Sequence, residues 1–236
     1  MRHSDGDTNM QVTSSAKGFW GLLSDAEKRE LSDIGLPRIY PPGATMCVEG
    51  DPATHVFVLV GGQVKILSAT NDGQRLMLAL RGDGDIVGEI AGATTGHRNA
   101  TVQAVDTVHA LIVPYARFNA FLESNPAADR AYKIMLTRRL SDADAKLRTR
   151  SVTTGAQRLA GLLLELADRH GIPDHNEIQL TISLSQEEWA SLAGTSRATV
   201  TRALSDWRKR GFIRTGQRRI AIVNQVALKR VSGSRI

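Results

Sequence analysis

One stretch decides the fold of the C-terminal part of the chain: residues 185–204 read SQEEWASLAGTSRATVTRAL. Ser185 and Glu188 have the spacing of a capping box, which predicts that a helix begins here. Gly194 follows at a point where the chain must turn sharply, a conformation that glycine tolerates best. Ser196 is a good N-cap for a second helix.

The second predicted helix has two different faces. Val200 and Leu204 lie inward at helical spacing, while Arg197, Ala198 and Arg202 lie on the opposite face. This is the helix-turn-helix pattern, in which the second helix enters the major groove of DNA. The alternative, an ordinary pair of packed helices, explains the spacing but not the basic face.

A basic turn follows the two predicted helices. Gly216-Gln217-Arg218-Arg219 separates two short apolar runs, Phe212–Arg214 and Ile220–Val223, which we expect to pair as strands. Such a β-hairpin wing can lie along phosphates. Arg218 and Arg219 are therefore candidate DNA-backbone contacts.

The charge distribution also favours a polyanion partner for this half. Residues 1–145 carry 14 Lys and Arg against 17 Asp and Glu, a net charge of −3. Residues 146–236 carry 16 against 7, a net charge of +9, and the two halves sum to +6. Charge alone is equally compatible with a solvated basic face, so this reading depends on the helix-turn-helix.

The N-terminal half has a different pattern. Short apolar runs alternate with Gly and Asp turns between Pro41 and Val113; these runs are Val56–Val60, Val64–Leu67, Leu76–Leu80, Thr101–Val105 and Ala110–Val113. Short strands at this spacing are typical of an all-β sandwich or barrel.

One long helix is predicted between the two halves. From about Pro126 to Arg150 there is no glycine and no internal proline. A narrow apolar stripe runs along it, formed by Tyr132, Leu136, Leu140, Ala143 and Leu147. Such a stripe suits a two-stranded seam, so we expect this helix to pair with its copy in a homodimer.

The segments fall into four units. We expect a disordered arm (1–17), an effector-sensing β unit (18–125), a dimerisation helix with a hinge (126–153) and a winged helix-turn-helix (154–236). Capping boxes predict a short helix from Ser24 to about Asp33, and Thr154 is a candidate cap for a Leu-rich helix from Gly155 to His170. The fold class is α+β.

Several classes of protein are not supported by the sequence. A single cysteine, Cys47, leaves no disulfide framework, Cys-rich zinc site or iron–sulfur cluster within one chain. The six histidines form no metal-binding pattern, and no nucleophile elbow or P-loop occurs, so we predict neither a metal site nor an enzyme. No apolar run of about 18 residues is present, and the first 17 residues lack an apolar core. We therefore expect a cytoplasmic protein without membrane contact.

The stretch from Gly194 to Leu204 resembles the recognition helix of the cyclic AMP receptor protein and fumarate–nitrate regulator (Crp/Fnr) family of bacterial transcription regulators. The resemblance covers about residues 18 to 224 and implies a β-roll, a dimer helix and a winged helix-turn-helix. It implies that Arg197 and Arg202 read bases, whereas Ser196 and Thr199 contact phosphates. Ala198 replaces a base-reading Glu and accepts no hydrogen bond, so the operator should differ at that position.

The β region also resembles this family at its effector pocket. Gly88-Glu89-Ile90-Ala91, followed by Arg98-Asn99-Ala100, looks like the phosphate-binding cassette of cyclic-nucleotide-binding domains. The resemblance implies that Arg98 neutralises a phosphate, that Glu89 accepts from a ribose hydroxyl, and that backbone N–H groups cradle the phosphate. Cyclic AMP or another cyclic nucleotide is thus the expected effector.

The sequence departs from the family pattern at the same pocket. Gly92 and Ala93 stand where bulky aliphatic residues are usual, and Asn99 replaces a small or hydroxyl residue. Ala143 and Asp144 match a hydroxyl pair that touches the base, so weak binding is expected, with Asp144 able only to accept from an amine. Two alternatives stay open: a vestigial pocket in which Arg98 pairs with Glu89, and a different ligand.

The expected partners follow from these predictions. A two-fold symmetric dimer selects a nearly palindromic site on double-stranded DNA. The family resemblance adds RNA polymerase as a possible partner. A nucleotide-sensing subunit that acts on another protein is the competing hypothesis; it explains the cassette but not the basic half.

Overall fold

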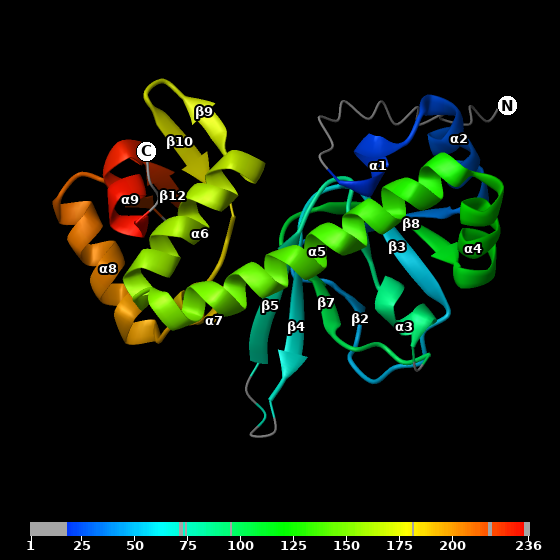
Figure 1. Cartoon of the computed structure of the whole chain (residues 1–236), viewed down its shortest axis with the longest axis horizontal. Coiled ribbons are helices and arrows are strands. Elements are labelled where there is room, and N and C mark those ends of the chain that lie inside the picture. Colours follow the sequence, from blue (N-terminus) through cyan, green and yellow to red (C-terminus); the bar gives the residue numbers. More distant parts are fainter. Residues whose placement is uncertain are drawn as a thin grey trace, which may run out of the picture.

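The structure, a computed structural model, describes residues 18–70, 73, 75–94, 96–180, 182–216 and 219–233. The predicted arm, residues 1–17, and Arg218 of the predicted wing lie outside these residues. Figure 1 shows a β-rich N-terminal part and a smaller C-terminal part, joined by one long helix, α5 (Pro126–Val152). None of the described helices combines the length and apolarity that a membrane crossing needs.

Two four-stranded antiparallel sheets form the N-terminal part. The first has the strand order β1 (Leu36–Tyr40), β8 (Val108–Pro114), β3 (His55–Gly61) and β6 (Ile86–Val87). The second has the order β2 (Thr45–Cys47), β7 (Thr101–Ala104), β4 (Val64–Ala69) and β5 (Arg75–Arg81). The prediction of many short strands is confirmed, although β1, β2 and β6 were not predicted.

Strand β3 shows why the sequence forms two layers here. Its residues read HVFVLVG, an unbroken apolar run, because both faces of the strand are covered. Phe57 and Leu59 belong to the core between the two sheets. Val56, Val58 and Val60 face the opposite way and join a second core under the helices.

Four helices cover the outer face of the first sheet: α1 (Phe19–Leu22), α2 (Asp25–Ile34), α4 (Tyr115–Ser124) and the first half of α5. The capping box that starts α2 is confirmed, since the Ser24 side chain accepts from the N–H of Glu27 and the Glu27 carboxylate accepts from the N–H of Ser24. A short helix, α3 (Glu89–Ala93), has Gly88 as its N-cap and contacts β3.

The C-terminal part contains helices and a sheet around one core. Its helices are α6 (Gly155–His170), α7 (Gln186–Ala193), α8 (Arg197–Lys209) and α9 (Gln225–Ser232). Its sheet has the order β11 (Ile213–Gly216), β12 (Arg219–Ile222), β10 (Glu177–Leu180) and β9 (Ile172–Asp174). The caps predicted at Thr154, Ser185 and Ser196 are all present, whereas β9 and β10 were not predicted.

The two parts of the chain also share a core. Leu67, Met77 and Leu80 of β4 and β5 lie in the same buried cluster as Trp189 of α7. At its edge, Lys65 Nζ and Glu188 Oε1 are 2.5 Å apart, and the N–H of Met77 donates to Ser191 Oγ over 3.0 Å. The outer face of the second sheet therefore holds the first helix of the predicted helix-turn-helix.

Candidate effector site and DNA-reading helix

Arg98 is the most deeply buried charge of the predicted cassette. Its side chain is only 3% exposed and stacks on the ring of Phe57, with Cζ 5.2 Å from the ring centroid. Nη1 donates to the carbonyl oxygen of Gly88 over 3.3 Å. Among the described residues, no carboxylate lies within ion-pairing distance of it. A buried guanidinium without a countercharge is costly and is suited to an anionic ligand.

Gly88 makes room for this guanidinium. The residue has φ of +82°, and an added Cβ would lie 2.3 Å from Arg98 Nη1. A side chain is therefore excluded here by both backbone conformation and space. The structure thus brings together Gly88 and Arg98, two residues of the predicted cassette.

The unusual Gly92 also has a physical reason. An added Cβ at this position would lie 2.4 Å from the ring of Tyr115, at the start of α4. The Tyr115 hydroxyl donates to the carbonyl oxygen of Gly88 over 2.6 Å. Burial raises the pKa of Tyr115 above its ordinary value, and the nearby Arg98 opposes that shift. The Tyr115 ring therefore occupies the space that a bulky aliphatic residue at position 92 would need. Its hydroxyl holds the cassette at Gly88.

The partner of Glu89 is not the one that we considered for a vestigial pocket. Glu89, 6% exposed, accepts from Nη1 of Arg139 on α5 over 2.5 Å, rather than from Arg98. Nη2 of Arg139 lies 3.2 Å from Asp85 Oδ1 and donates to the carbonyl oxygen of Ile86 over 2.8 Å. The Arg98–Glu89 pair is therefore wrong, and Glu89 instead ties the cassette to the long helix.

The other cassette positions differ in exposure. Ala91 is fully buried, whereas Ile90 and Asn99 are exposed. Ala143 and Asp144 on α5 are also exposed. The residue that joins α5 to the cassette is Arg139, one turn before Ala143, and the sequence analysis did not single it out.

The reading face of α8 is open to solvent. Ser196, Arg197, Ala198 and Arg202 are exposed, while Thr199 is half-buried. Inward, Val200 is fully buried, as predicted, and Leu204 is half-buried. Ser196 caps the helix by accepting from the N–H of Thr199 over 3.2 Å.

Two contacts hold the arginines of this face. Arg197 Nη1 lies 2.8 Å from Glu187 Oε1, and both side chains are largely exposed. An exposed pair of this kind contributes only about 0–1 kcal/mol, so Arg197 can exchange Glu187 for another partner at little cost. Arg202 Nε donates to the carbonyl oxygen of Ala198 over 3.3 Å. Arg219 is exposed at the start of β12.

A half-buried arginine fixes the turn of the motif. Arg158 on α6 donates to the carbonyl oxygens of Ala193 and Gly194 over 2.9 and 2.7 Å. It also donates to the carbonyl oxygen of Thr153, which follows α5. Gly194 has φ of +58°, as the predicted sharp turn requires. One side chain thus connects the hinge after α5 with the turn before the reading helix.

Comparisons with known proteins match both parts of the chain. Residues 37–125 match the cyclic nucleotide-binding domain, and residues 157–231 match the Crp-like helix-turn-helix domain. A CRP-like cAMP-activated global transcriptional regulator of Mycobacterium tuberculosis is 30% identical over 194 residues, which are 82% of this chain and 87% of that protein. The chain belongs to the Crp/Fnr family. This Crp/Fnr protein is therefore a DNA-binding transcription regulator with a cyclic nucleotide-binding domain.

Other similar proteins support the same family and the same fold. The cyclic AMP receptor protein of Thermus thermophilus is 29% identical over 195 residues, 83% of this chain and 87% of that protein. Among solved structures, the c-di-GMP responsive global regulator CLP of Xanthomonas campestris has a TM-score of 0.72 at 22% identity, covering 84% of this chain and 99% of that one. The predicted fold class is confirmed.

The five residues predicted to face a dimer seam divide into two groups in this Crp/Fnr chain. The ring of Tyr132 lies 6.3 and 5.5 Å from the rings of Phe19 and Phe118, and Leu136 packs against the same core. Leu140, Ala143 and Leu147 are exposed. Tyr132 and Leu136 therefore contact their own chain, and the exposed part of the stripe begins at Leu140.

Proposed function

We propose that this regulator binds a cyclic nucleotide in its β-roll, with cyclic AMP as the first candidate. The observation that supports this most is Arg98, a buried guanidinium that stacks on Phe57 and faces no described carboxylate. A phosphate would supply the missing countercharge. Two relatives bear names that refer to cyclic AMP, one as cAMP-activated and one as a cyclic AMP receptor protein.

Glu89 would connect the bound nucleotide to the long helix. Its carboxylate already accepts from Arg139 and has a second oxygen for a ribose hydroxyl. The remaining cassette positions, Gly88, Ile90, Ala91 and Asn99, would line the phosphate, and Asp144 on α5 would accept from the base. A ligand that binds one arrangement of α5 better than another shifts the population toward it, by about 1–3 kcal/mol of coupling.

Calorimetry with cyclic AMP and cyclic GMP tests this proposal. The wild type should bind one of them, and Arg98→Gln should abolish the heat of binding, because the amide keeps the shape but loses the charge. Arg117→Gln on α4 is a matched control, since Arg117 is exposed and outside the cassette. No binding to the wild type at millimolar concentration would favour the vestigial pocket or a different ligand.

We further propose that the regulator is a two-fold symmetric homodimer paired through α5. A groove of about 640 Å³ runs beside the distal half of α5, between β5, α6 and α7. Leu147 lines it from α5, and Leu76 and Leu78, both exposed, line it from β5. The parallel α5 of a second copy would cover these side chains together with Leu140 and Ala143.

The dimer would present two copies of α8 to a nearly palindromic operator. Arg197 and Arg202 would read bases, Ser196 and Thr199 would contact phosphates, Ala198 would face the groove, and Arg218 and Arg219 of the wing would lie along the backbone. Because the target is DNA, we place the protein in the cytoplasm. RNA polymerase is a further proposed partner, on the strength of family membership alone.

Binding to selected and random DNA tests the assignment of bases and phosphates. Arg197→Ala should cost about 1–3 kcal/mol on the selected site and little on random DNA. Arg219→Ala should weaken both nearly equally and reduce the salt dependence. Equal losses for Arg197→Ala on both DNAs would reassign Arg197 to the backbone.

A further inference from the structure

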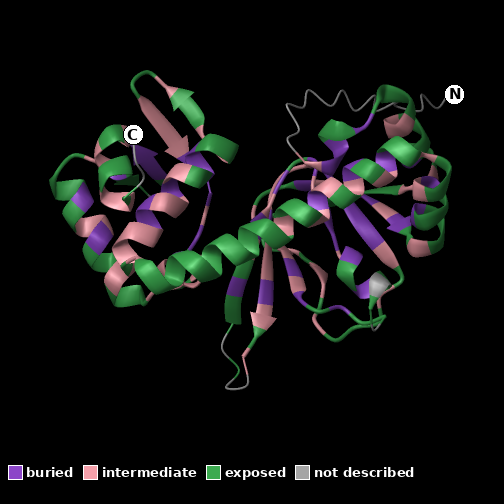
Figure 2. Ribbon diagram, in the orientation of Figure 1, coloured by how far each residue is buried: buried purple, intermediate pink, exposed green. Residues whose placement is uncertain are grey.

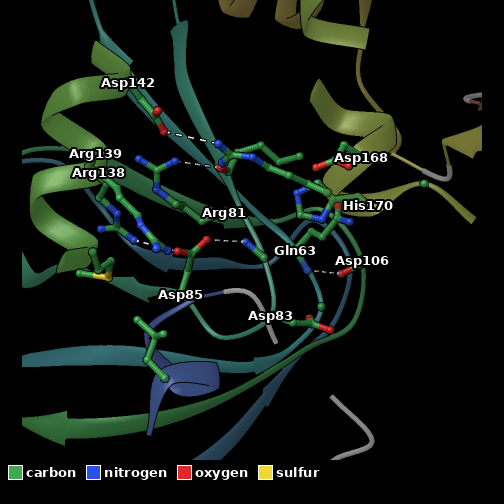
Figure 3. A pocket seen from close by; sticks show the side chains of 18 of the residues that line it. Gln63, Arg81, Asp83, Asp85, Asp106, Arg138, Arg139, Asp142, Asp168 and His170 are labelled. Atoms are coloured by element: carbon green, nitrogen blue, oxygen red, sulfur yellow. Dashed lines mark hydrogen bonds and ion pairs between the residues drawn. The ribbon is translucent and has the colours of Figure 1, made fainter. Parts of the chain in front are cut away.

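A second cavity lies apart from the cassette, where the β-roll, α5 and the C-terminal part meet (Figure 3). Its volume is about 690 Å³, within the range of small-molecule sites. The β-roll contributes Gln63, Arg81 and Asp106, helix α5 contributes Arg139, and the end of α6 contributes Arg169 and His170. A molecule bound here would contact both parts of the chain at once.

The arginines that line this cavity differ in how they are paired. Arg139 has Asp85 at 3.2 Å, and Arg169 has Asp142 at 3.4 Å. Arg81, half-buried, donates Nη1 to the carbonyl oxygen of Leu80 over 3.1 Å. No carboxylate of a described residue lies within ion-pairing distance of Arg81. Burial, and then the positive charge of Arg139, lower the pKa of Arg81, although it remains a cation.

Gln63, another residue that lines the cavity, carries an unsatisfied polar atom. Its backbone N–H donates to Asp106 Oδ1 over 2.7 Å, which fixes the turn that carries the side chain. Its Oε1 atom is buried and has no hydrogen-bond partner among the described residues. An unsatisfied buried acceptor costs about 1–3 kcal/mol, so such atoms call for a donor. Gln63 and Arg81 are both among the residues that line the cavity (Figure 3).

We propose that this cavity binds a small anionic metabolite. A phosphate or carboxylate group would take the free guanidinium N–H groups of Arg81. The site is separate from Arg98, but it shares Arg139, whose other nitrogen is bound to Glu89 of the cassette. Ligands at the two sites would therefore act on the same side chain of α5, one directly and the other through Glu89.

Thermal unfolding of the full-length protein tests the proposal, with pyrophosphate and citrate as the probes for the two anion chemistries. At constant ionic strength, one or both should raise the unfolding midpoint of the wild type in a saturable way. Arg81→Gln should weaken the apparent affinity at least about tenfold. Gln63→Glu, which adds to the cavity lining a negative charge that repels an anion, should do the same if Arg81→Gln fails to fold.

Two matched variants make the result specific. Arg117→Gln and Arg98→Gln should respond to the probes as the wild type does, since neither residue lines this cavity. A response that persists unchanged in Arg81→Gln and Gln63→Glu overturns the proposal, as does the absence of any saturable response to both anions. Loss of the response in Arg98→Gln alone would assign the anion to the cassette and also overturn it. The cyclic-nucleotide titration is independent of these outcomes.

Discussion

The two halves of α5 have opposite surroundings although they form one continuous helix. In the first half, Ala128, Ala131 and Met135 are buried against the β-roll, and Tyr132 packs between aromatic rings. From Leu140 to Val152 every residue is exposed, and Leu140 and Leu147 are 65% and 63% exposed. Figure 2 shows the change along the helix, from buried residues over the sheets to green along the distal half.

This contrast assigns different tasks to the two halves. The first half stabilises its own β-roll and contributes Arg139 to the cassette. The second half carries leucines that its own chain does not cover, and a bare apolar stripe of this kind marks an interaction surface. A helix with such a division holds the β-roll at one end and would join the proposed second copy at the other.

The strongest test of this division is Leu140→Asp. The substitution would place two carboxylates in the dimer seam, which should cost roughly 4 kcal/mol, or about a thousandfold in the dissociation constant of the dimer. Light scattering should then find monomers at micromolar concentration. Ser141→Asp, one residue away, is the control. A wild type that is already monomeric at that concentration would refute the dimer.

Tyr132→Ala tests the first half. Loss of a half-buried ring between Phe19 and Phe118 should lower the free energy of unfolding by about 3 kcal/mol. Chemical denaturation measures this change. Light scattering should still give the same dimer as the wild type. A monomeric Tyr132→Ala protein would mean that the seam extends into the first half, and the division would move toward the N-terminus.

Arg139→Lys tests the point at which the two halves meet. Lysine keeps the charge but lacks the planar fork that reaches both Glu89 and Asp85. We expect a loss of about 1 kcal/mol in the free energy of unfolding and a weaker affinity for cyclic nucleotide. Unchanged nucleotide affinity would show that Arg139 has only a structural role.

The smallest expected effect concerns the ionisation of Tyr132. Burial, and then the nearby negative charge of Glu89, raise its pKa to about 12. Since the folded protein favours the neutral phenol, this contribution to stability is fully present below the ordinary pKa of 10.0 and is lost as the pH rises through the folded value. Tyrosinate absorbance, measured after rapid jumps to a series of pH values, should show a titration step near pH 12 that Tyr132→Phe removes. A step near the ordinary pKa would contradict the packing.

Much of the fold followed from local sequence signals. Capping boxes and unbroken apolar runs depend on neighbouring residues, so the starts of α2, α6, α7 and α8 and the course of β3 were predictable. Strand β1 was not, because its outer residues are exposed and it has no alternation. The packing of Tyr132 against its own β-roll was not predictable either, since a helical stripe does not reveal which neighbour covers it.

The candidate site was also predictable only in part, where its residues belong to a local sequence motif. The pairing of Gly88 with Arg98 followed from a motif, but Arg139 and Tyr115 lie 50 and 27 positions from the cassette residues that they contact. Only the tertiary fold brings such pairs together. Arg158 was missed for the same reason, because its partners are backbone carbonyls, which leave no mark in the sequence.

Glu188 has a consequence for how the C-terminal part can move. One carboxylate oxygen, Oε2, accepts from the N–H of Ser185 over 2.7 Å and starts α7, while the other, Oε1, meets Lys65 of the β-roll. Burial raises the pKa of Glu188, but the hydrogen bonds from Lys65 and Ser185 outweigh it, and the pKa lies below its usual value. If the C-terminal part swings away from the sheet, Glu188 loses its bond to Lys65 and Ser191 loses its bond to Met77, but the bond between Glu188 and Ser185 remains. Helix α7 would therefore keep its first turn while its contacts with β4 and β5 are lost.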